Sequence, residues 1–188
     1  MPLFTLVAAY TLDPFLGLYP ALFRFLLFIV LVNTIAPGIS ILIMKRRGVI
    51  SDLEIRNKSE RIIPFLLFLF YYLLSYLLIR LRNAIVPEEV LVIFFAVVLS
   101  LIVGIIVNRY TKISMHLMAM GGFCGVIAGL NVVHLLGIGH YLAISFILAG
   151  LLGWSRITQS LHTHKQVYLG FSVGFAIHYF LLIWKIYP

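Results

Sequence analysis

The chain has 188 residues, of which 63% are hydrophobic and 11% are charged, and its mean hydropathy is +1.12. Soluble domains carry about 25% charged residues, so the composition excludes an ordinary soluble protein and indicates an integral membrane protein. The formal net charge is +8, but the basic residues lie between apolar runs and form no solvated stripe, which argues against a nucleic-acid partner. The length allows about six membrane-spanning helices of roughly 20 residues, so we expect one domain over residues 1–188.

The first 19 residues are apolar but are interrupted by Asp13 and Pro14. This interruption comes too early for the segment to cross a hydrocarbon layer of about 30 Å. We therefore expect an interfacial or re-entrant segment there. A cleaved signal peptide is the alternative, although the basic region that such a signal requires does not precede the apolar stretch.

The first membrane span is expected to begin at Pro20 or Leu22 and to end at Met44, because three consecutive basic residues follow and cannot enter hydrocarbon cheaply. Five further spans, each bounded by charges, proline or glycine, are expected at residues 62–79, 89–107, 116–136, 141–154 and 167–186. In the fourth span, glycines three or four residues apart predict the close approach of a neighbouring helix. The predicted fold class is all-α, a compact bundle of six transmembrane helices.

Three polar segments interrupt these spans, at residues 51–64, 108–116 and 155–166. Each is separated from the next by two spans, and an even number of crossings returns the chain to the same membrane face. We therefore expect the three polar segments to build one site.

The third polar segment, SRITQSLHTHKQ, contains the residues of a nucleophilic site. Gln166 follows His162 by four residues, so it lies one helical turn away and can orient the imidazole through a hydrogen bond. An imidazole oriented in this way presents its other nitrogen as a nucleophile. Arg156 offers a planar guanidinium that suits phosphate oxygens.

This segment resembles the third signature of the type 2 phosphatidic acid phosphatase superfamily, SRxxxxxHxxxD, which matches here at Ser155, Arg156 and His162. The resemblance implies that His162 becomes transiently phosphorylated. Gln166 stands where the signature has Asp. A neutral amide can orient the ring, but it cannot stabilise an imidazolium as a carboxylate would.

The second polar segment contains ISMH, which is similar to the PSGH signature of the same family with Met115 in place of glycine. The resemblance implies that Ser114 helps to hold phosphate and that His116 protonates the leaving oxygen, roles that suit a helix N-terminus. Lys112 and Arg109 precede them. Each is a candidate either for neutralising a diphosphate or for anchoring the span at the headgroups.

The first polar segment resembles the family's KxxxxxxRP signature only loosely, because Glu54 stands in the place of the lysine and Ile62 follows Arg61 in the place of the proline. Arg56 and Arg61 are five residues apart beside Lys58. These basic residues can clamp phosphate oxygens from a loop.

The resemblance covers most of the chain and implies an enzyme, a membrane hydrolase that removes phosphate from a lipid phosphate or diphosphate without a metal or another cofactor. The predicted catalytic residues are His162, His116 and Arg156, the predicted phosphate-binding residues are Arg56, Lys58, Arg61, Lys112 and Ser114, and Gln166 is the predicted orienting residue. Zinc ligation by His162, His164 and His116 is the alternative use of the histidines, but neither Cys nor a carboxylate completes a familiar ligand set. The expected partners are the lipid substrate and membrane lipids.

Two other classes stay open on the sequence. A lipid-phosphate binder or transporter would keep the basic residues and lack turnover, which the departures at Glu54, Met115 and Gln166 motivate. A structural membrane subunit with a coincidental motif is the third class. We expect the bacterial cytoplasmic membrane, with two orientations open: the positive-inside rule places the polar segments in the cytoplasm, whereas bacterial family members open their site outward. The lipid and the oligomeric state also stay open.

Overall fold

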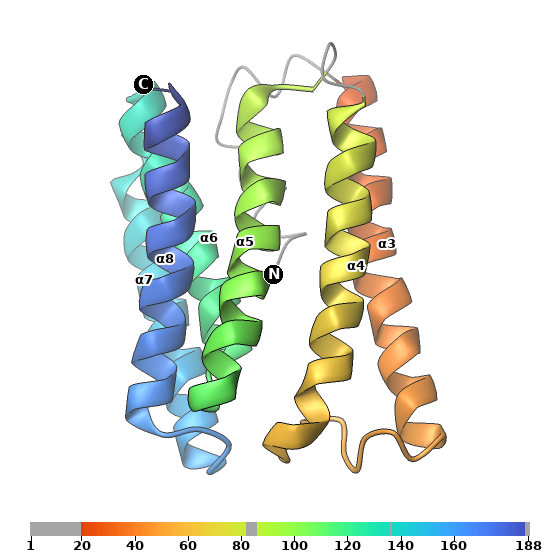
Figure 1. Cartoon of the computed structure of the whole chain (residues 1–188). Helices are drawn as coiled ribbons and strands as arrows, with labels where there is room; N and C mark the ends of the chain where they lie inside the picture. The colour runs from red at the N-terminus through yellow and green to blue at the C-terminus, as the bar shows by residue number, and fades with distance from the viewer. Residues whose placement is uncertain (1–19, 82–85, 136, 187–188) are drawn as a thin grey trace.

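The computed structural model describes residues 20–81, 86–135 and 137–186, so the segment expected at the interface, residues 1–19, lies outside the described residues. Most of the described residues are helical, and there is no strand among them. The helices are α3 (Pro20–Arg46), α4 (Ile62–Arg80), α5 (Glu88–Tyr110), α6 (Met115–His134), α7 (Gly139–Thr158) and α8 (His164–Ile186), with a short 3₁₀ helix, η1 (Lys58–Arg61), before α4. Figure 1 shows them side by side as one bundle.

All six helices are long and apolar enough to cross a membrane. The sequence-based expectation of an all-α bundle with six spans is therefore confirmed, as is the class of integral membrane protein. The largest difference concerns the fifth span, which was expected to end at Trp154, whereas α7 continues to Thr158. Polar residues and a cation are compatible with the last turn of a helix, so Ser155 and Arg156 lie on a helix and not in a loop.

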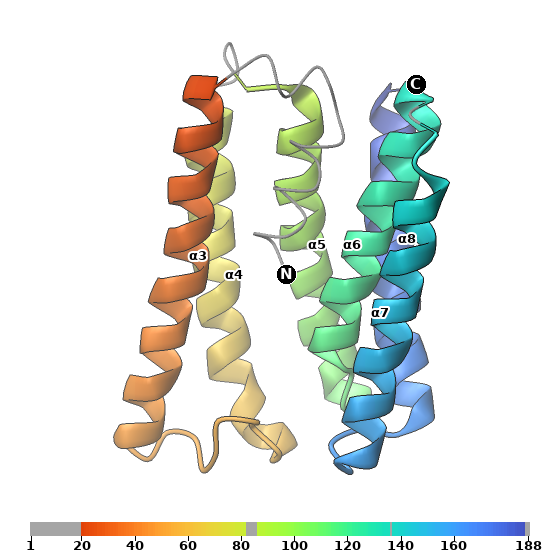
Figure 2. The same cartoon turned by 180° about the vertical axis from the view of Figure 1, so that it is seen from behind.

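The polar segments lie at one end of the bundle. Figures 1 and 2 show the connections from α3 to α4, from α5 to α6 and from α7 to α8 at the lower end, while α3 begins and α8 ends at the upper end. The expected grouping of the polar segments on one side is confirmed.

Helices α6 and α8 approach each other so closely that their backbones touch. A Cβ atom at Gly121 would meet the carbonyl oxygen of Phe171, and one at Gly174 would meet the carbonyl oxygen of Met118. Small residues permit this approach in membranes, where helix association depends on packing and not on the hydrophobic effect. The glycine pattern of the fourth span thus has the predicted partner, which is α8.

The apolar core closes the upper half of the bundle. It joins the beginning of α3, the end of α4, the first turns of α5 and the second halves of α6 and α8, through Leu26, Ile79, Val90, Leu130 and Leu182 among others. Large apolar side chains on the outer faces stay exposed, as expected of lipid-facing helices; Trp184, for example, is 77% exposed. The lower half of the bundle is open to a cavity.

Replacing Gly174 with alanine tests the α6–α8 contact. The added Cβ has to displace backbone of α6, and we expect a loss of about 1–3 kcal/mol of stability, measured as a lower Tm of the purified protein in detergent. Gly150→Ala on α7 is the matched control, because a Cβ there has no neighbour within 4 Å. Equal Tm values for the two variants would contradict the described packing.

Candidate functional site

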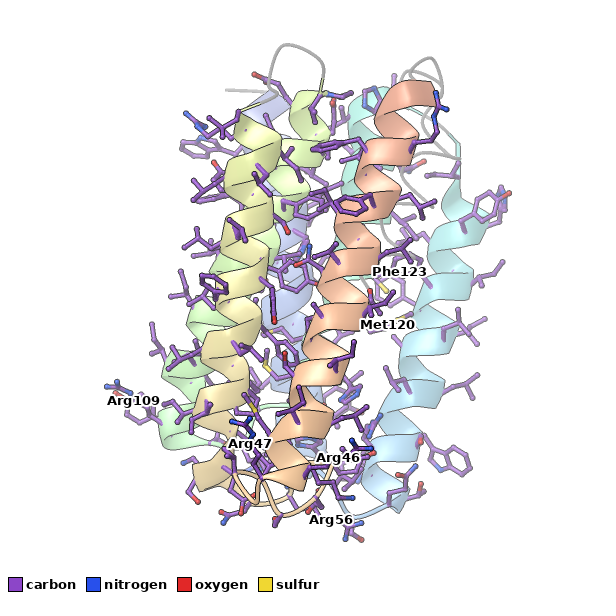
Figure 3. The ribbon with its side chains drawn as sticks, turned by 90° about the vertical axis from the view of Figure 1, so that its right-hand side faces the viewer. Arg46, Arg47, Arg56, Arg109, Met120 and Phe123 are labelled. Atoms are coloured by element: carbon purple, nitrogen blue, oxygen red, sulfur yellow. The ribbon has the colours of Figure 1, made fainter. Side chains whose placement is uncertain are left out.

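A cavity of about 650 Å³ extends from the polar end into the bundle. Its polar end is lined by Glu54, Arg61, His116, Arg156 and His162. Farther in, its walls are mostly apolar and come from α3, α4, α5 and α6, including Leu42, Phe65, Phe68, Val97, Leu101 and Phe123. Figure 3 shows Phe123 on α6, toward the space between α3 and α7. The size is typical of a ligand cavity, and the lining suits a molecule with an anionic head and an apolar tail.

His162 lies in the connection between α7 and α8 and is fixed by two acceptors. Its Nδ1 is 3.2 Å from the carbonyl oxygen of Lys112 and 3.2 Å from Oε1 of Gln166. A carbonyl oxygen can only accept, so Nδ1 carries the proton and Nε2 of the neutral ring keeps its lone pair. The nitrogen available to a ligand is therefore the nucleophilic one.

The surroundings keep this imidazole uncharged. Burial lowers the pKa of His162 to about 4, the positive charges of Arg61 and Lys112 act in the same direction, and the hydrogen bonds that His162 donates to Gln166 and to the Lys112 carbonyl oppose them only in part. A lowered pKa means that the neutral form dominates at every pH above about 4. His162 is thus in its nucleophilic form at neutral pH.

Gln166 has a second role at the start of α8. Its Oε1 also accepts from the backbone N–H of Thr163 at 3.2 Å, and its own N–H donates to Oγ1 of Thr163 at 3.4 Å. These reciprocal bonds form a capping box, which fixes the first turn of the helix. The amide that orients His162 is itself held in place by the helix terminus.

The three polar segments are hydrogen-bonded to one another. Arg61, which is buried, donates from Nη1 to the carbonyl oxygen of Ile113 at 3.2 Å, and so joins the first segment to the second. The second joins the third where Ser114 N–H donates to the carbonyl oxygen of Gln166 at 3.4 Å. The relative positions of Arg61, His116 and His162 therefore depend on main-chain contacts.

The first and third polar segments meet at an ion pair. Nη1 of Arg156 lies 2.8 Å from Oε2 of Glu54. The next residue, Ile55, offers its carbonyl oxygen to Nε of Arg61 at 2.9 Å and has a φ of 46°, an unusual value for a β-branched residue. Glu54 and Ile55 thus supply acceptors to both arginines of the cavity.

The other predicted phosphate-binding residues lie around the cavity and not on its wall. Nζ of Lys58 donates to the carbonyl oxygen of Arg109 at 2.8 Å. Ser114 is fully buried, and its Oγ has no hydrogen-bond partner. Arg56 is exposed at the polar end of the bundle (Figure 3). Partial burial and the nearby charge of Arg61 lower the pKa of Lys112, whose carbonyl group binds His162.

Two features of the cavity were not predicted. Sequence reasoning treated Glu54 only as a substitute for a lysine and did not pair it with Arg156. It also assigned no role to His178, which falls within the expected sixth span at residues 167–186, whereas His178 lines the inner part of the same cavity. The available signal was the position of a polar residue within an apolar span, which by default indicates function.

Among the described residues, no group of three His, Cys, Asp or Glu side chains is placed to hold a metal ion. Comparison of the chain with protein-family models, curated proteins and solved structures found no significant match.

The geometry around His162 predicts its titration. In the wild-type protein we expect the ring to stay neutral down to about pH 4, with the proton on Nδ1. Gln166→Asp should raise this pKa, because a carboxylate favours the imidazolium. Titration of ¹⁵N-histidine signals by NMR, assigned with His162→Ala, measures both. A wild-type ring that gains its proton near pH 6.5 would contradict the described environment.

Proposed function

We propose that this protein is an integral membrane phosphatase that releases inorganic phosphate from a lipid phosphate or diphosphate. The observation that carries the proposal is the single cavity in which a neutral His162, His116 and two arginines meet at the polar end of an otherwise mostly apolar interior. Such a cavity suits an amphiphile whose head meets the basic residues while its chain stays among the helices. The resemblance in the polar segments points to the same chemistry.

In the proposed reaction, the lone pair on Nε2 of His162 attacks phosphorus. A P–N bond forms while the bond from phosphorus to the lipid oxygen breaks, and His116 donates a proton to that oxygen. Water then attacks the phosphorus with His116 as the base, which returns the proton to His116; the P–N bond breaks, Nε2 of His162 regains its lone pair and phosphate is released. Each step uses groups of this chain and one water molecule.

The two arginines would stabilise the charge that develops on the phosphoryl oxygens, since phosphoryl transfer depends mainly on positioning and electrostatics. Nε of Arg156 is buried and has no hydrogen-bond partner. Nη1 of the same residue is engaged by Glu54. A phosphate group in the cavity would accept a hydrogen bond from Nε of Arg156. It would also compete with the Glu54 carboxylate for Nη1.

A lipid-phosphate binder without turnover is the second candidate. It is favoured by Gln166, because the neutral amide beside His162 orients the ring but cannot stabilise an imidazolium as a carboxylate would. We place either candidate in a bacterial cytoplasmic membrane. Impermeant labelling of single cysteines introduced at Val49 and at Leu81 would show which face of that membrane bears the site.

Phosphate release by the purified protein separates these candidates. We expect release from at least one lipid among phosphatidic acid, phosphatidylglycerol phosphate, prenyl diphosphates and phosphorylated lipid A, in the presence of chelator. His162→Ala should lower this activity by at least about a thousandfold, as expected for the loss of a nucleophile.

His164→Ala is the matched control, since His164 is exposed two residues away and does not line the cavity. It should retain the activity. Release that survives His162→Ala would overturn the phosphohistidine route, and tight lipid binding without release would favour the binder.

Removing the charge of Glu54 should strengthen the binding of the lipid phosphate. In Glu54→Gln the carboxylate no longer competes for Arg156, and we expect the KM for the lipid phosphate to fall about twofold to fivefold, the scale of a partly exposed ion pair. Glu89→Gln makes the same change in net charge in the first turn of α5, at the end of the bundle opposite the polar segments (Figure 1), and should leave KM unchanged. A rise in KM for Glu54→Gln would mean that Glu54 positions Arg156 for the substrate.

A further inference from the structure

The inner part of the cavity contains polar side chains at membrane depth. Asn33 on α3, Ser100 on α5 and His178 on α8 all line it, and they are only 4%, 6% and 5% exposed. Asn33 precedes the end of α3 at Arg46 by 13 residues, which at 1.5 Å per residue is about 20 Å. Ser100 precedes the end of α5 at Tyr110 by 10 residues and His178 follows the start of α8 at His164 by 14 residues, which correspond to about 15 Å and about 21 Å. These groups are therefore well removed from His162.

Asn33 presents acceptors to its surroundings. Its Nδ2 donates to the carbonyl oxygen of Ile29 at 2.8 Å and to Oγ of Ser75 on α4. Because the Ile29 carbonyl can only accept, the orientation of the amide is fixed. Its Oδ1 is left buried without a partner. Pro37, four residues later, has no N–H, so the carbonyl oxygen of Asn33 also lacks the usual backbone hydrogen bond within the helix.

Ser100 and His178 complete this set. Oγ of Ser100 is buried and has no partner. Nδ1 of His178 is 2.9 Å from the carbonyl oxygen of Gly174 and so carries a proton, which leaves Nε2 of the neutral ring as an acceptor. A Cβ at Gly122 would lie 2.7 Å from Cε1 of His178, so glycine at this position makes room for the ring.

We propose that Asn33, Ser100 and His178 form a second, polar subsite that binds a hydrogen-bond donor within the hydrocarbon part of the ligand. The proposed class of ligand is a phosphorylated lipid with a hydroxyl group or an amide N–H along its chain. The proposal rests on the proposed function, because the phosphate at the polar end would set the depth at which the donor is met.

The chemistry of the three residues determines the class of the ligand. Oδ1 of Asn33 and Nε2 of His178 accept, and a serine hydroxyl can accept or donate, so a ligand donor is common to all three. Buried polar atoms in native proteins are nearly always hydrogen-bonded, and burial without a partner costs free energy. A plain hydrocarbon chain would leave Oδ1 of Asn33 and Oγ of Ser100 without a partner. A chain with a donor at the matching depth satisfies at least one of them.

Binding of synthetic alkyl phosphates to the full-length protein in nanodiscs tests the subsite directly. The probes are hexadecyl phosphate and a series in which one hydroxyl group is moved along the chain, each with its methyl ether. We expect one hydroxyl position to bind about tenfold more tightly than the plain chain, and the corresponding ether to lose this gain. A flat series, or an ether that keeps the gain, would overturn the proposal.

Variants identify the residues involved. Ser100→Ala and Asn33→Leu should each abolish most of the hydroxyl gain while the affinity for plain hexadecyl phosphate stays the same. Thr34→Val is the matched control, because Thr34 also lines the cavity but its hydroxyl donates to the Val30 carbonyl at 2.9 Å. It should retain the gain. If Asn33→Leu fails to fold, Ser100→Ala and His178→Phe decide, and a gain that persists in both overturns the proposal.

Phosphate release, measured in parallel on the same probes, separates the two proposals. A hydroxyl preference in binding without any release would refute the phosphatase and leave the subsite standing. Release with a flat binding series would refute the subsite and leave the phosphatase standing.

Discussion

The close contact of α6 with α8 is the constraint on which the site depends. It continues to the polar end of the bundle, where a Cβ at Gly170 would lie 2.5 Å from the carbonyl oxygen of Ser114. The same contact brings Ser114 N–H to the carbonyl oxygen of Gln166. His116 begins one of these helices and His162 precedes the other, so backbone packing sets their separation. A flexible loop would not fix the relative positions of these two side chains in this way.

Main-chain acceptors hold three of the basic groups at the polar end. Arg61, Lys58 and His162 each contact a backbone carbonyl of another polar segment. Such contacts neutralise no charge, so the end of the bundle stays electropositive while its geometry is fixed. Arg156 differs because its partner is the side chain of Glu54. A side chain can move away more easily than backbone, so this pair is the part of the site most readily exchanged for a ligand.

Patterns of residue type and spacing along the chain predicted the features that depend on residues close in sequence. Long apolar runs between charges predicted six helices, the even number of crossings placed the polar segments together, and the spacing of His162 and Gln166 predicted their contact. The pairing of Glu54 with Arg156 joins residues 102 positions apart and leaves no local signal. The burial of Ser114 depends on Gly170, and the position of His178 in the cavity depends on which face of an evenly apolar helix turns inward.

One end of the cavity is polar and its inner walls are mostly apolar. In the proposed reaction this difference separates the two products. The phosphate ion is made at the polar end, where water receives it, whereas the dephosphorylated lipid is left among apolar walls continuous with the interior of the bundle. An ion cannot enter hydrocarbon and a long chain cannot enter water without a large cost in free energy. Phosphate would therefore leave into water, and the dephosphorylated lipid would leave into hydrocarbon. The reverse reaction would require phosphate and the dephosphorylated lipid to enter the cavity again from its opposite ends.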